Sequence, residues 1–117
     1  MNRQHTLAEA KREVLHLAPG FRAAGEEMIY AAGRDILAAL RVGVFMGHEA
    51  AALTDHEVVI GNKLAEVLTG GDLSRPTWVS ESYILERERE AFLSLCGEEK
   101  TQQRMWHLVQ HKKPLRN

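Results

Sequence analysis

Apolar residues recur every three or four positions along almost the whole chain, and this spacing indicates helices rather than strands. Glycine and proline interrupt the pattern at intervals, so each helix is expected to be short. The expected helices cover about residues 6–18, 34–46, 54–69, 80–96 and 99–110. The only candidate strand is the short stretch EEMIYAA. The predicted fold class is therefore all-α, a small bundle of about five helices that forms one domain over residues 1–117.

Several helix starts carry side chains that can accept a hydrogen bond from a free backbone N–H group. Thr6 and Glu9 have the spacing of a capping box, and so do Thr54 and Glu57. Ser80 is a further N-cap candidate for the fourth helix. The third helix is expected to end at a pair of glycines, residues 70–71.

The helix interiors give two further expectations about packing. Leu85, Phe92, Leu95 and Cys96 form an apolar stripe that is expected to face the core. Cys96 is the single cysteine and has no base partner by motif, so we expect an inert core residue. Gly43 lies inside the second helix, where glycine costs roughly 1 kcal/mol relative to alanine. Its presence there indicates a close approach of backbone.

Charge is spread unevenly along a chain whose net charge is only −1. After Glu99 there are five cations and no acidic residue, although the whole chain has no excess charge that would attract nucleic acid or a membrane. Such an end can bind an anion, or it can simply be a solvated helix end favoured by the helix dipole. The N-terminal residues have no apolar segment typical of a secretory signal, and no apolar stretch is long enough to cross a bilayer. A cytoplasmic location is expected. The five cations are Lys100, Arg104, Lys112, Lys113 and Arg116.

No short motif specifies a catalytic or metal site. His107 and His111 share one helical face, which suits a transition metal, but the spacing supplies no third ligand. The stretch HEAAALTDHE resembles a zincin motif only superficially, because a helix start separates its two histidines. The loop GGDLSRP lacks the Gly-Lys-Ser/Thr ending of a phosphate-binding loop. We therefore predict no catalytic residue and no metal ligand. The further candidates weighed in the histidine-rich stretch are His48, Glu49, Asp55, His56 and Glu57.

Longer stretches carry a more specific signal. The pieces KLAEVLTGGDL, EREAFLSLCGEEKTQ and the terminal KPLRN resemble the C-terminal region of bacterial bifunctional 3-hydroxyacyl-CoA dehydrogenase/enoyl-CoA hydratases. The hydratase half of those enzymes is of the crotonase type. The resemblance covers most of the chain and is looser over residues 22–33 and around MGHEAAA.

The resemblance implies a part of a fatty-acid β-oxidation enzyme. The two hydratase carboxylates, the oxyanion hole and the glycine-rich nucleotide loop of that family have no counterpart here. The chain is therefore expected to be a fragment with a structural and assembly role, without catalysis of its own. It would hold no cofactor, whereas the parent enzyme uses NAD and a CoA thioester. Its expected partners are the crotonase core and, through exposed apolar helix faces, a second copy. The candidate exposed side chains are Trp78, Trp106, Phe45 and Met46.

In crotonases the last helix helps to bind CoA, and the stretch MWHLVQHKKPL has a similar layout. The resemblance thus places Leu108, His111, Lys112 and Lys113 near CoA, together with His107. His111 stands where the family has a lysine. The alternative hypothesis is a stand-alone helical binding or regulatory module, which the acid-free end favours. The sequence lacks the glycine turn and basic recognition helix of a helix-turn-helix, so no nucleic-acid partner is predicted.

Overall fold

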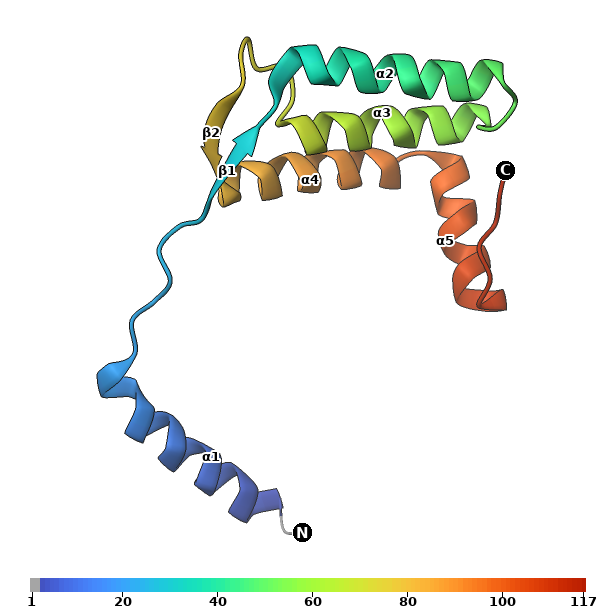
Figure 1. Ribbon diagram of the computed structural model, residues 1–117. Helices are drawn as coiled ribbons and strands as arrows, with labels where there is room; N and C mark the ends of the chain where they lie inside the picture. The colour runs from blue at the N-terminus through green and yellow to red at the C-terminus, as the bar shows by residue number, and fades with distance from the viewer. Residues whose placement is uncertain (1–2) are drawn as a thin grey trace.

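A computed structural model describes residues 3–117, with side chains from residue 5 onward. Five α-helices dominate it, which confirms the predicted predominantly α class (Figure 1). Among the described residues, no helix has both the length and the apolar character needed to cross a membrane. The elements are α1 Arg3–Leu17, the 3₁₀ helix η1 Ala18–Gly20, β1 Met28–Ala31, α2 Gly33–Glu49, α3 Asp55–Thr69, β2 Thr77–Ser80, α4 Glu81–Cys96 and α5 Glu99–His111.

Helices α2, α3 and α4 form the body of the molecule, with α3 packed between the other two (Figure 1). Two of its helices approach closely at Gly61 of α3, where an added Cβ would lie 3.0 Å from a methyl group of Val44 in α2. Within residues 5–117, the fully buried apolar side chains are only Ala31, Leu37 and Ala65. The core is therefore small and lies along α3.

A two-stranded antiparallel sheet closes one end of this body. Met28 pairs with Ser80 and Ala31 pairs with Thr77, so the sheet ties the entry to α2 to the entry to α4. The rings of Tyr30 and Trp78 pack together with centroids 5.3 Å apart. The strand expected within EEMIYAA is confirmed, whereas β2 was not predicted. Its partner is distant in sequence, and its four residues are too few to show a period of two.

Helix α1 projects from the body. Residues 21–27, which have no regular secondary structure, connect its end to β1. Every residue of α1 with a described side chain is exposed; Leu7 exposes 74% of its surface and Val14 63%. The radius of gyration is 21.0 Å, whereas a compact chain of this length has about 13 Å. The described chain is thus much more open than a compact bundle.

Local boundary predictions were confirmed at three places. Thr54 and Glu57 form a complete capping box, and the Ser80 hydroxyl accepts a hydrogen bond from the N–H of Tyr83. Gly70 ends α3 in the left-handed region, with φ 76°. The capping box expected at Thr6 is wrong, because the helix already begins at Arg3 and Thr6 lies inside it.

Two packing predictions were also wrong. Leu85 and Phe92 expose 54% and 58% of their surface, because a different side of α4 packs on α3. Only Leu95 and Cys96 of the predicted inner stripe are half-buried. Gly43 has open space where a Cβ would be, so it marks no close backbone contact.

Candidate functional site: the C-terminal helix and its returning tail

Helix α5 turns away from α4 after Gly97, and the chain beyond it reverses direction (Figure 1). Lys112 ends the helix in the left-handed conformation with φ 56°, and its N–H bonds to the carbonyl oxygen of Leu108. Residues 113–117, the KPLRN stretch, then run back along α5. We call these five residues the returning tail.

Arg116 fixes the returning tail to the N-terminus of α3. Its Nη2 lies 2.9 Å from Oε2 of Glu57, and the same group also donates to the main-chain oxygen of Ala52. Arg104 of α5 approaches the other carboxylate oxygen of Glu57 at 3.9 Å. One carboxylate therefore joins α3, α5 and the returning tail.

Asn117 is engaged through both its side chain and its main chain. Its Oδ1 accepts from Arg104 Nε at 2.7 Å, and its Nδ2 donates to Oε1 of Gln103 at 2.8 Å. Its main-chain oxygen accepts from Arg104 Nη2 at 3.2 Å and from the Thr54 hydroxyl at 3.1 Å. The side chain of Asn117 is thus held by α5, and its main-chain oxygen also contacts the N-cap of α3.

Hydrogen bonds to Glu57 lower its pKa below the ordinary value of 4.5. The largest cause is the backbone N–H of Thr54, which donates to Oε2 of Glu57 at 2.8 Å. The hydrogen bond from Arg116 is the next cause, and each favours the charged carboxylate. Glu57 is therefore held as an anion and serves as a structural acceptor.

The histidine-rich stretch contributes to structure at two places. His56 is buried, with 4% of its surface exposed, and its Nε2 lies 2.9 Å from the hydroxyl oxygen of Thr101 in α5. His48 Nε2 lies 2.9 Å from a carboxylate oxygen of Asp55. Across residues 5–117, no group of three or more potential metal-ligating side chains comes together.

The side chains expected near CoA gather at the far end of α5. The rings of His107 and His111 have centroids 4.5 Å apart, and His107 Nδ1 donates to the main-chain oxygen of Lys113 at 2.9 Å. Leu108, Lys112 and Lys113 are exposed, and the structure shows no ion pair for either lysine among residues 5–117. We call these five residues the basic tip.

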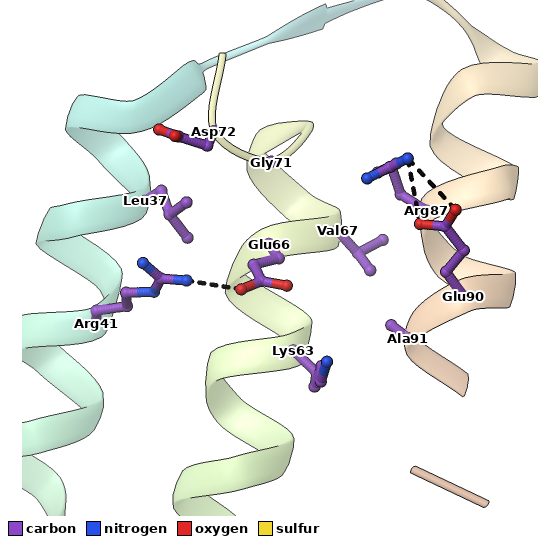
Figure 2. A pocket seen from close by; sticks show the side chains of 10 residues that line it. All are labelled: Leu37, Arg41, Lys63, Glu66, Val67, Gly71, Asp72, Arg87, Glu90 and Ala91. Carbon is purple, nitrogen blue, oxygen red and sulfur yellow. Dashed lines mark hydrogen bonds and ion pairs between the residues drawn. The ribbon is translucent and has the colours of Figure 1, made fainter. Parts of the chain in front are cut away.

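A cavity of about 290 Å³ lies between α2, α3 and α4. Figure 2 shows that its charged side chains largely pair with one another. Arg41 Nη2 lies 2.6 Å from Glu66, and Arg87 Nη2 lies 3.2 Å from Glu90. The Nε atom of Arg87 is buried without a hydrogen-bond partner. No motif predicted this cavity, because its charges come from three separate helices.

Large apolar side chains cover much of the surface. The four expected to be exposed are indeed so, with exposed fractions between 61% for Phe45 and 65% for Trp106. They come from α2, β2 and α5, so they are spread over the molecule instead of forming one local patch.

Comparison with known proteins gives one informative relative. The chain is 41% identical over 118 aligned residues to a probable 3-hydroxyacyl-CoA dehydrogenase of Bacillus subtilis (strain 168). The alignment covers all of this chain and 15% of that relative. No protein-family model matches the chain, and no solved structure matches it. The chain is thus similar throughout to one segment of a much longer enzyme.

Proposed function

We propose that this chain is the helical region of a cytoplasmic fatty-acid β-oxidation enzyme that combines 3-hydroxyacyl-CoA dehydrogenase with enoyl-CoA hydratase. Its role is structural, and its apolar helix faces pack on the crotonase-type catalytic core. The 41% identity to a dehydrogenase over the whole chain supports the parentage. The stretches EREAFLSLCGEEKTQ and KPLRN, which resemble such bifunctional enzymes, support the hydratase half.

The observation that carries this proposal is the surplus of exposed surface. The chain exposes 9373 Å². A self-contained globular protein of 13.2 kDa exposes only about 6400 Å². The chain thus exposes roughly 3000 Å² more than such a protein. Many large apolar side chains contribute to its exposed area, and their contact with water is unfavourable. A further protein surface is therefore needed to cover it.

The polar groups of the chain support a role without catalysis. Glu57 is occupied by Thr54, Arg104 and Arg116, so it is not free to accept a proton from a substrate. The purified chain should neither hydrate a 2-enoyl-CoA nor oxidise a 3-hydroxyacyl-CoA with NAD. Clear turnover in either assay would refute the structural role.

The packing on a catalytic core can be measured directly. The Bacillus subtilis relative would be produced without the segment that matches this chain, and this chain would be added separately. We expect a one-to-one complex and recovery of soluble enzyme, because the exposed apolar faces are then covered. Failure of the two pieces to associate at micromolar concentrations would contradict the proposed packing.

The basic tip is proposed to lie near the CoA phosphates in the intact enzyme. Each exposed lysine–phosphate contact contributes roughly 1 kcal/mol or less, so the chain alone should bind CoA only at millimolar concentration. Changing Lys112 and Lys113 to Ala in the full enzyme should raise KM for enoyl-CoA at low salt. Lys11→Ala on α1 is the matched control. An unchanged KM for the double variant would favour the solvated helix end.

The alternative function is a stand-alone helical binding module. It is favoured by the exposed lysines after Glu99, where no acidic residue offsets their charge. A titration with duplex DNA at low salt separates the two functions. Submicromolar affinity with a steep salt dependence would support the binding module.

A further inference from the structure

Two apolar grooves lie on the parts of the chain that project from the three-helix body. The first has a volume of about 350 Å³ and is lined by Val14, Leu17, Ala18 and Phe21, at the end of α1 and in η1. Phe21 exposes 77% of its surface there. In α1, apolar side chains also recur upstream of this groove at helical spacing, as Leu7 shows. This end of α1 therefore carries an exposed apolar face.

The second groove has a volume of about 260 Å³ and lies on the outer face of α5. It is lined by Met105, Trp106 and Val109, with Gln102 at its edge. The opposite face of α5 holds Thr101 and Arg104, which bond to α3 and the returning tail. Because that inner face is already occupied, the outer face needs a partner from elsewhere.

We propose that a second copy of this chain fills these grooves, with α1 of each copy packed on α5 of the other. Figure 1 shows α1 and α5 projecting from the same side of α4, at opposite ends of the molecule. Each chain carries one apolar face at the end of α1 and one on α5. Two reciprocal contacts related by a twofold axis therefore use every such surface, and no open-ended chain of molecules forms.

The geometry and the surface area both fit this arrangement. Residues 21–27 have no regular structure and can span about 23 Å when extended, which gives α1 the reach of an exchanged arm. Stable obligate dimers bury about 2000–5000 Å² in total. The surplus of roughly 3000 Å² per chain, relative to a compact protein of this mass, is enough for such an interface. The inference goes beyond the proposed function, because it says what covers these surfaces in the isolated chain, where no catalytic core is present.

Sedimentation equilibrium of the full 117-residue chain over a concentration series tests this proposal. We expect a discrete species of twice the chain mass. Val14→Glu and Trp106→Glu should each raise the dimer dissociation constant roughly 30-fold or more, as for a hot-spot residue. Both side chains are more than 60% exposed, so circular dichroism should show unchanged helix content. Phe45→Glu on α2, with 61% exposure, is the matched control and should leave the dimer intact.

Mixing the two variants identifies the pairing. A Val14→Glu chain keeps an intact α5 groove, and a Trp106→Glu chain keeps an intact α1. The mixed dimer therefore retains one of its two contacts and should be tighter than either variant alone. A monomeric wild-type chain, an open-ended series of oligomers, or a mixture no tighter than its components would overturn the proposal.

Discussion

Arg116 and Glu57 lie 59 positions apart in the sequence and form an ion pair with Nη2 2.9 Å from Oε2. The carboxylate that receives Arg116 also completes the capping box of α3, because Glu57 accepts the backbone N–H of Thr54. The start of one helix and the end of the sequence thus share a single charged group. Attachment of the returning tail and capping of α3 are therefore coupled.

Replacing Arg116 by Ala should release the returning tail. The variant loses both the ion pair to Glu57 and the hydrogen bond to the oxygen of Ala52. We expect faster amide hydrogen exchange in residues 113–117 and a lower midpoint of thermal unfolding. Arg12→Ala is the control, because the Arg12–Glu9 pair is exposed and local, and such pairs contribute about 0.5 kcal/mol or less. If the two variants changed hydrogen exchange and the thermal midpoint equally, the contacts of Arg116 would not attach the returning tail.

Glu57 should also make stability depend on pH. Its pKa is lowered in the folded chain relative to 4.5, chiefly by the Thr54 N–H and next by Arg116. The stabilisation is therefore fully present above pH 4.5 and is lost as the pH falls below that value through the folded-state pKa. In urea unfolding at a series of pH values, the free energy of unfolding should decline less with falling pH in the Glu57→Gln variant than in the unchanged chain. An identical pH profile for the variant would contradict the assignment.

The features that sequence predicted are those fixed by neighbouring residues. The box from Thr54 to Glu57 and the cap at Ser80 need contacts only three positions away, so the pattern alone identifies them. Gly70 ends a helix because the left-handed conformation suits glycine, which is again a local property. The five helices and most of their boundaries followed from such signals.

The features that sequence did not predict depend on distant partners. The apolar stripe of Leu85 and Phe92 is visible in the sequence, but the side of α4 that packs is decided by α3. The hydrogen bond from the Thr54 hydroxyl to the main-chain oxygen of Asn117 joins two residues that lie 63 positions apart. Strand β2 exists only because β1 pairs with it. Spacing within a segment carries no information about these contacts.

Thr54 should contribute more to stability than an ordinary cap. Thr54→Ala removes the acceptor for the Glu57 N–H, and loss of such a cap costs about 1 kcal/mol. It also removes the hydroxyl that donates to Asn117. Ser80→Ala removes only a cap of α4, with its partners at Tyr83 and Ser82, and serves as the comparison. Chemical denaturation should give Thr54→Ala a lower free energy of unfolding than Ser80→Ala. Thr54→Ser, which keeps the hydroxyl, should lose much less stability than Thr54→Ala. The reverse order would mean that the Asn117 contact adds no stability.

Gly43 and Gly61 provide a matched pair of helix-interior glycines. A Cβ at position 43 in α2 meets no atom within 4 Å, so Gly43→Ala gains helix propensity without a clash. We expect it to stabilise the chain by about 0.5–1 kcal/mol.

At position 61 the same change places the new methyl group 3.0 Å from Cγ2 of Val44. Valine is confined to few rotamers in a helix, so its side chain cannot easily move away. Overpacking of this kind costs about 1–3 kcal/mol, which offsets or exceeds the gain in propensity. Urea unfolding should therefore find Gly61→Ala less stable than Gly43→Ala by about 1–3 kcal/mol. If both variants were stabilised equally, α2 and α3 would not be in contact at Val44, and the packing of the three-helix body would be incorrect.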